Sequence, residues 1–174
     1  MVLNLKTDAT RASIQIGLVS LLAYLIGFHL TALFHGATAS IGGLWSAISG
    51  IVVLQTTRHD TRTSASLRVV GTAVGSIISG LYLSLLPFSA VGLCAATVLT
   101  VLVCYGLRIA DHARLAAITV SVIMVTASLN PTMNALENAA LRFGESCIGT
   151  ALAVLAVILW PHDAPAARRG GPEP

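Results

Sequence analysis

The stretch LRFGESCIGTALAVLAVILW, residues 141–160, is mostly apolar and is long enough to cross a lipid bilayer as one helix. Its first turns nevertheless carry Arg142 and Glu145, three residues apart. A second stretch, LRVVGTAVGSIISGLYLSLL at residues 67–86, also opens with Leu-Arg and places a glycine at the same distance from its arginine. The sequence therefore combines helices suited to hydrocarbon with charged residues that hydrocarbon disfavours.

The overall composition indicates an integral membrane protein. Of the 174 residues, 55% are hydrophobic and 10% are charged, and the mean hydropathy is +0.84. Soluble domains usually carry roughly 25% charged residues, so this chain has too few to cover a water-soluble surface of its size. The formal net charge of +3 does not indicate nucleic acid as a partner, because the lysines and arginines cluster in alternate loops.

Six apolar segments predict an all-α protein with six transmembrane helices. Breakers and polar clusters such as HGATAS, QTTRHDTRTS and NPTMNALEN separate them. We expect a short cytoplasmic N-terminus at 1–11, a six-helix membrane transporter domain at 12–160 and a disordered cytoplasmic tail at 161–174. The segments are 12–34, 41–54, 65–86, 88–107, 115–129 and 139–160.

The positive residues predict how the helices are oriented. With a cytoplasmic N-terminus, nine of the ten lysines and arginines fall on the cytoplasmic side, and only Arg142 falls outside. Such a bias is the positive-inside signal, so both termini are expected in the cytoplasm. The cytoplasmic set is Lys6, Arg11, Arg58, Arg62, Arg68, Arg108, Arg114, Arg168 and Arg169.

An offset of 74 residues relates the two halves of the chain. It pairs Arg68 with Arg142, and the segment 41–54 with residues 115–128. Because each unit holds three helices, the second unit enters the membrane from the opposite side. The sequence therefore predicts a three-plus-three inverted repeat, the plan that many secondary transporters use for alternating access.

The second and fifth segments, 41–54 and 115–129, hold only 14 and 15 residues, fewer than the roughly 20 that a full span needs. Short paired segments are a pointer to the binding site of a transporter. As re-entrant loops they would move Arg58, Arg62 and Arg68 to the outside and weaken the charge bias, so we expect spans.

Three motifs carry a resemblance to a known family. The first motif, TRTSASLRVVGTAVGSIISG at 61–80, combines an arginine with spaced glycines. The second, ENAALRFGESCIGTALAV at 137–154, contains a Glu-x4-Arg helix opening. The third, LWSAISGIVVLQ at 44–55, resembles the second helix of the same family. Together they resemble the fusaric acid resistance (FUSC) and aromatic acid exporter proteins over about residues 12–160.

This resemblance implies a multi-pass protein of the plasma (inner) membrane that is linked to efflux of aromatic carboxylic acids. Plant aluminium-activated malate channels are similar in plan. Larger members carry two such membrane blocks or a long cytoplasmic helical domain, whereas here only a short tail follows. We therefore expect two chains, a homodimer, to make the working unit.

Arg142 is the first candidate for substrate binding. A guanidinium stays charged and can hold a carboxylate through two parallel hydrogen bonds. Alternatively, Arg142 forms a structural ion pair with Glu145, or with Glu137 from the preceding turn. Arg68 is either an anchor whose side chain reaches the headgroups, or a matching gate at the inner end of one anion path.

Other polar and small residues have two interpretations each. His29 could carry protons for coupled transport, or could be an interfacial residue. Gly71 and Gly75 form a G-x3-G pattern that lets helices approach, within the fold or across a dimer. Trp45 and Trp160 are candidates for the membrane interface.

The serine, histidine and aspartate residues do not fall in any known catalytic motif, so no enzyme activity is expected. The three cysteines lack metal-like spacing, and neither a metal nor a cofactor is expected. The favoured function is export of small organic anions, aromatic or other carboxylates, across the inner membrane. The alternative is a non-transporting scaffold or anchor for a partner protein, and a pump for cations would need acids that outnumber the arginines.

Overall fold

Polar caps at three helix starts follow directly from the sequence. Thr57 accepts a hydrogen bond from the backbone of Asp60, and Ser89 accepts one from Gly92. The side chain of Asn134 accepts from the first turn of the last helix. Each cap satisfies backbone N–H groups that a helix start leaves without a partner, which fixes where these three helices begin.

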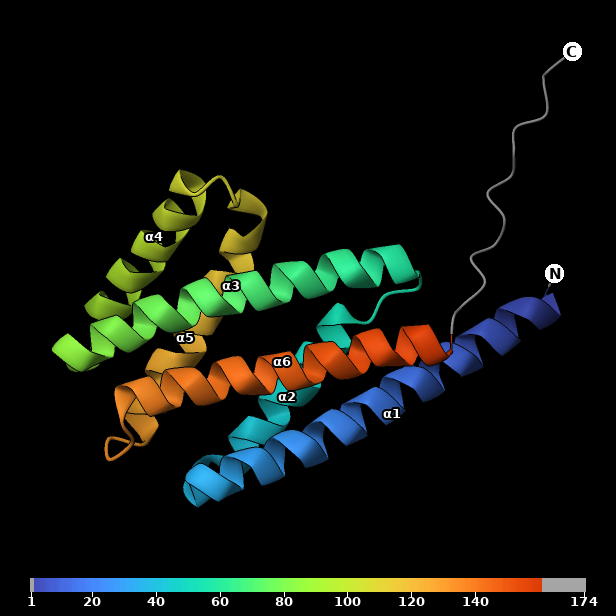
Figure 1. Ribbon diagram of the computed structural model, residues 1–174, viewed down its shortest axis with the longest axis horizontal. Coiled ribbons are helices and arrows are strands. Elements are labelled where there is room, and N and C mark those ends of the chain that lie inside the picture. The colour runs from blue at the N-terminus through green and yellow to red at the C-terminus, as the bar shows by residue number, and fades with distance from the viewer. Residues whose placement is uncertain (1, 161–174) are drawn as a thin grey trace, which may run out of the picture.

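A computed structural model describes residues 2–160, with side chains from residue 9 onward (Figure 1). All its regular elements are helices, which confirms the all-α fold. The predicted cytoplasmic N-terminus lies only partly within the described residues, and the predicted disordered tail lies outside them. The elements are α1 (Val2–Phe34), the 3₁₀ turn η1 (Gly36–Thr38), α2 (Ala39–Val53), α3 (Arg58–Leu85), α4 (Ala90–Gly106), the 3₁₀ turn η2 (Ala110–His112), α5 (Ala113–Leu129) and α6 (Ala135–Leu159).

Five of these helices are long and apolar enough to cross a membrane. The second and fifth reach that length because a 3₁₀ turn precedes each, giving Gly36–Val53 with 18 residues and Ala110–Leu129 with 20. This length agrees with the expectation that both are spans. The shorter apolar helix is α4, whose 17 residues still meet the lower limit for a span.

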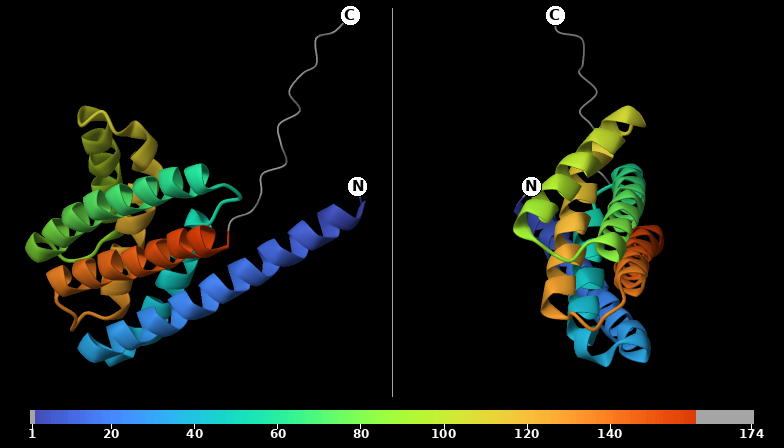
Figure 2. Two further views of the ribbon diagram at one scale, coloured as in Figure 1. Left: turned by 45° about the vertical axis from the view of Figure 1, so that its right-hand side comes forward. Right: turned by 90° about the vertical axis from the view of Figure 1, so that its left-hand side faces the viewer.

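The helices form two sets that cross each other. In Figure 1, α1, α3 and α6 run roughly alongside one another, while α2 and α5 cross behind them, and both views in Figure 2 agree. Helix α6 packs against α1, α2 and α3, whereas α4 packs mainly against α5. The contacts follow the 74-residue correspondence, because α2 packs on α6 in the way that α5 packs on α3.

Two hydrogen bonds join three helix ends on one side of the bundle. Arg58, at the start of α3, donates to the carbonyl oxygen of Ile158 at the end of α6 (3.2 Å). Gln15 of α1 donates to the carbonyl oxygen of Trp160 (3.4 Å). The start of α3 and the end of α6 therefore lie beside the N-terminal half of α1, as an even number of crossings requires.

The distribution of polar side chains is that of a membrane protein. Large leucine, isoleucine and valine side chains cover the outer surface, and the buried polar or charged side chains are about as numerous as the buried hydrophobic ones. In lipid, helices associate through close packing of small residues and through polar contacts, because lipid is as apolar as leucine. Glycine, alanine, serine and threonine accordingly make up much of the interior.

Two glycines separated by 74 residues make corresponding contacts. A Cβ at Gly149 of α6 would collide with the carbonyl oxygen of Ser46 in α2, and a Cβ at Gly75 of α3 would lie 2.5 Å from the carbonyl oxygen of Ala116 in α5. Gly71 also faces α5. The G-x3-G pattern therefore serves packing within one protomer, so it no longer supports the homodimer.

Replacing Gly149 by alanine should destabilise the protein, by roughly 1–3 kcal/mol for an overpacked backbone contact. The added Cβ would also lie 2.7 Å from the backbone nitrogen of Gly50, and neither backbone atom can rotate away. Unfolding by SDS titration, followed by circular dichroism, measures the loss.

The matched control is Gly144→Ala on the same helix, where the nearest atom to a new Cβ is a Leu30 methyl group at 3.9 Å. This change should leave stability unchanged or raise it, because alanine forms helix better than glycine. Equal stability of the two variants would contradict the close packing of α2 on α6.

Candidate functional site

Helix α6 carries an ion pair in the middle of the protein. The Nη2 atom of Arg142 lies 2.9 Å from Oε1 of Glu145, and both side chains are 0% exposed. This is the sole salt bridge among the residues whose side chains are described. Of the two acids predicted as partners of Arg142, Glu145 forms the ion pair and Glu137 does not.

Two further helices complete the surroundings of Glu145. Thr31 of α1 donates its hydroxyl hydrogen to Oε1 of Glu145 (2.5 Å). Gly42 of α2 leaves the room for this contact, because a Cβ there would lie 2.5 Å from the same oxygen and would collide with Thr31. A threonine, a glycine and an ion pair thus bring α1, α2 and α6 together.

Much of the hydrogen-bonding capacity of the pair remains unused. No nitrogen of the Arg142 guanidinium has a hydrogen-bond partner of good geometry among the described residues, although Nη2 faces Glu145 closely. The Oε2 atom of Glu145 also has none. Burying a charged donor without hydrogen bonds costs more than burying a neutral one, so these atoms mark a candidate binding centre.

Arg68 of α3 points into the bundle and is only 1% exposed. Its Nε and Nη2 atoms donate to the hydroxyl oxygen of Ser49 at 3.2 and 2.8 Å. The guanidinium carbon lies 4.6 Å from the centre of the Trp45 ring, a cation–π contact. Arg68 is therefore not an anchor reaching the headgroups, and the buried Trp45 is not an interfacial residue, whereas Trp160 is exposed.

The two arginines lie on either side of the contact between α3 and α6. Thr72 and Ser146 share a hydrogen bond of 3.1 Å across this contact, and each follows its arginine by four residues. Four residues rise about 6 Å along a helix. Because α3 and α6 run in opposite directions (Figure 1), Arg68 and Arg142 are displaced toward opposite ends of the bundle.

The charges inside the bundle do not cancel. Arg68 forms no ion pair with any described acid, and Arg142 shares the single buried carboxylate with no other cation. Charged groups at the centre of a membrane cost about 2.5–3.5 kcal/mol each on insertion scales, and they are usually paired or functional. The described interior thus carries an excess of one positive charge.

Other buried polar atoms also have no hydrogen-bond partner. Apart from His112 Nδ1 of η2, they come from α2, α3 and α6, the helices that carry or contact the two arginines. They include Trp45 Nε1, Ser46 Oγ, Ser76 Oγ and Thr150 Oγ1.

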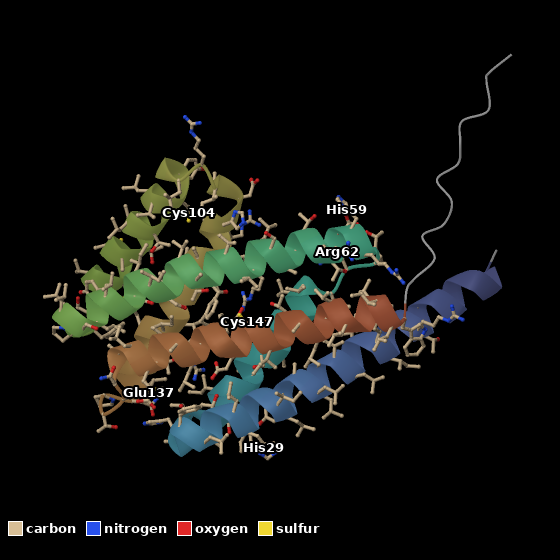
Figure 3. The ribbon with its side chains drawn as sticks, in the orientation of Figure 1. His29, His59, Arg62, Cys104, Glu137 and Cys147 are labelled. Atoms are coloured by element: carbon tan, nitrogen blue, oxygen red, sulfur yellow. The ribbon has the colours of Figure 1, made fainter. Side chains whose placement is uncertain are left out.

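Figure 3 shows Glu137 near the start of α6 and His29 on α1. Glu137 is half-buried in the first turn of α6 and makes no ion pair with Arg142. His29 is exposed on α1, where its ring meets the ring of Phe28 edge-on at 5.5 Å. The structure therefore does not bring these two candidates to the arginines.

Three functional candidates escaped the sequence analysis. Thr31 and Ser49 are single polar residues within apolar helices, a signal that is present in the sequence but common to many other positions. The cation–π contact of Trp45 depends on which residue of α3 lies against its ring. All three contact a charged side chain of the buried cluster.

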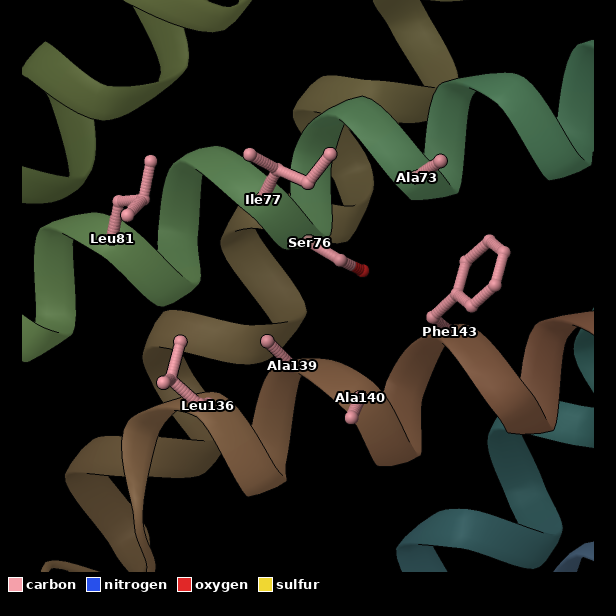
Figure 4. A pocket seen from close by; sticks show the side chains of 8 residues that line it. All are labelled: Ala73, Ser76, Ile77, Leu81, Leu136, Ala139, Ala140 and Phe143. Atoms are coloured by element: carbon pink, nitrogen blue, oxygen red, sulfur yellow. The ribbon is translucent and has the colours of Figure 1, made fainter.

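A groove of about 480 Å³ lies between α3 and α6 (Figure 4). Ser76 points into it, and Phe143 stands opposite. On α6, the groove residues occupy one face, whereas Glu145 contacts α1 and α2 on another. The groove is therefore distinct from the charged centre. Its lining is Ala73, Ser76, Ile77, Leu81, Leu136, Ala139, Ala140 and Phe143.

Replacing Ser49 by alanine should lower the free energy of unfolding by roughly 1.5–3 kcal/mol, the range for a hydrogen bond to a charged group. The change removes both hydrogen bonds that Arg68 makes. Ser79→Ala on α3 is the control, because that buried hydroxyl bonds only to carbonyl groups of its own helix. Both variants can be compared by SDS titration. A loss in Ser79→Ala as large as in Ser49→Ala would contradict a specific role for the Arg68 contact.

Comparison with known proteins places the chain in a family. Residues 18–156 match the sequence profile of the family described as fusaric acid resistance protein-like. No curated protein and no solved structure matches the chain. The matched region extends from α1 to α6 and contains both buried arginines, the ion pair with Glu145 and the Arg68–Trp45 contact. The chain belongs to the fusaric acid resistance protein-like family of membrane proteins.

Proposed function

We propose that the protein exports small organic anions, aromatic or other carboxylates, across the plasma membrane. Membership of the family indicates a transport or efflux-related role in a membrane. The observation that supports the anionic substrate is the interior with two buried guanidinium groups and one carboxylate. Such an interior attracts an anion and repels a cation.

The positions of the arginines support a path through the protein. Arg68 and Arg142 lie on either side of the Thr72–Ser146 contact, so that an anion passing along α3 and α6 would meet them in turn. In this proposal the two halves form an inverted repeat, and Arg68 faces the inner end. An inside-negative potential favours anion exit by about 2.3 kcal/mol per charge per 100 mV.

The orientation belongs to the proposal as well. The excess of positive residues on the α2–α3 and α4–α5 connections favours a cytoplasmic position for those loops. The joined ends of α1, α3 and α6 then also lie at the cytoplasmic face, with both termini inside. The homodimer stays a prediction, and neither nucleic acid nor an enzymatic reaction is part of this proposal.

A scaffold or anchor subunit is the alternative of a different class. A scaffold has no need for Arg68, whose buried charge lacks an acidic partner, because a packed apolar side chain would be at least as stable. The two proposals differ in one measurable property, since only a transporter moves an anion.

Removing either arginine should slow efflux of benzoate, an aromatic carboxylate, from loaded proteoliposomes by roughly tenfold or more, because a lost charge-assisted contact is worth 1.5–3 kcal/mol. The variants are Arg68→Gln and the double change Arg142→Gln/Glu145→Gln, which removes the ion pair as a whole. Arg68→Lys should restore efflux only in part, because lysine keeps the charge but loses the planar fork.

The control is Arg62→Gln, which removes an exposed positive charge from the same helix as Arg68 and should leave efflux unchanged. Rates are normalised to folded protein. Normal efflux in both Arg68→Gln and Arg142→Gln/Glu145→Gln would contradict the proposal. An absence of benzoate efflux from the unaltered protein would favour the scaffold.

Cysteine labelling tests the orientation. Thr56 and Thr132 are exposed in the α2–α3 and α5–α6 connections. With the three native cysteines replaced by alanine, Thr132→Cys should react with a membrane-impermeant maleimide on intact cells. Thr56→Cys should react only after lysis. The reverse result would invert the orientation and the assignment of inner and outer arginines.

A further inference from the structure

The ion pair of α6 raises a problem for any anion that approaches Arg142. The guanidinium already faces a carboxylate at 2.9 Å, in a place where neither side chain is exposed. A second carboxylate would bring two negative charges to one guanidinium in a region of low dielectric, where like charges repel strongly. Either the substrate avoids Arg142, or Glu145 loses its charge when the substrate arrives.

The geometry of Glu145 favours the second course. Its Oε1 atom receives both the hydroxyl of Thr31 and the approach of Arg142, while Oε2 has no hydrogen-bond partner. A proton can therefore bind at Oε2 without displacing Thr31. Neutralising the carboxylate releases the guanidinium, whose Nε and Nη1 atoms also lack partners, to form a planar pair with another carboxylate.

Few other charges face Glu145. Helix α2 contains no ionisable residue, and Gly42 is its closest contact. Helix α1 presents Thr31, while its His29 is exposed and turned to Phe28. On α3, the buried charge is Arg68, which contacts Ser49 and Trp45, and α5 carries an ionisable side chain only at its start. Arg142 is thus the main group that responds to the charge on Glu145.

The two halves of the protein differ at this position. The residue that corresponds to Glu145 at the 74-residue offset is Gly71, which faces α5. Arg68 accordingly has no internal carboxylate to displace. Only the arginine assigned to the outer end has a competing acid built beside it.

We propose, resting on the anion-transport function above, that Glu145 is an internal competitor for the substrate carboxylate and takes up one proton when an anion binds Arg142. The proton comes from the buffered solution and binds at Oε2, and the ion pair between Arg142 and Glu145 is replaced by one between Arg142 and the anion. The species held at this centre is then an anion together with a proton.

Isothermal titration with benzoate tests the linkage in purified Arg68→Gln protein, where only the Arg142 centre remains. Titrations in buffers with different heats of ionisation give the number of protons taken up per benzoate bound. At pH values where Glu145 is ionised, we expect about one proton to be taken up per benzoate bound. The affinity for benzoate should there fall by up to about tenfold for each unit by which the pH rises. In Arg68→Gln/Glu145→Gln, benzoate should bind without proton uptake and with little dependence on pH.

A second variant covers the case in which Glu145→Gln fails to fold. Thr31→Val keeps the ion pair but removes the hydroxyl that stabilises the ionised carboxylate, so the fall in affinity should move upward by about one pH unit. Thr100→Val is the control, because that hydroxyl bonds only to the carbonyl of Ala96 in its own helix.

The outcomes separate this inference from the function on which it rests. Benzoate binding without proton uptake in the protein that retains Glu145, or an unchanged pH profile in Thr31→Val, would overturn the inference and leave the transport proposal intact. No benzoate binding by the unaltered protein between pH 5.5 and 8.5, a range chosen as roughly that over which buried acids and histidines titrate, would overturn both.

Discussion

The buried contact between Arg142 and Glu145 constrains how this protein packs. A guanidinium in a membrane interior needs an opposite charge, and that charge needs its own hydrogen bond. Thr31 supplies the hydrogen bond, and the absence of a side chain at Gly42 supplies the space. Helices α1, α2 and α6 must therefore meet at one level, which is also where the small residues of α2 and α6 let their backbones approach.

Close backbone packing and a polar interior depend on each other here. Lipid gives little reason for apolar side chains to turn inward, so helices gain contact by approaching where side chains are small. Gly149 and Gly75 create such approaches in the two halves. Hydroxyl groups line part of the interior between them, as the Thr72–Ser146 hydrogen bond illustrates.

The sequence predicted the elements of this fold better than their contacts. Hydropathy located all six helices, because length and composition decide which segments suit a bilayer. It could not tell whether Arg68 extends outward to headgroups or inward to Ser49, since both directions are open to a side chain near a helix start. The outcome depends on the crossing of α2 over α3, which places Trp45 beneath the guanidinium. Likewise, the sequence could not tell whether Glu145 or Glu137 pairs with Arg142, because this depends on how the other helices pack around α6.

The cost of these charges is an argument about function. A buried ion pair adds little to stability compared with apolar residues of the same size, and an arginine without an acid costs more still. The cost of burying Arg68 is offset only by a hydrogen bond to a hydroxyl oxygen and by contact with an aromatic ring. Glycine and alanine contacts between the helices already hold the bundle together. Local rules are broken in this way chiefly at functional sites. An anion that visits Arg68 would supply the missing opposite charge, and at Arg142 it would have to replace the one that Glu145 already provides.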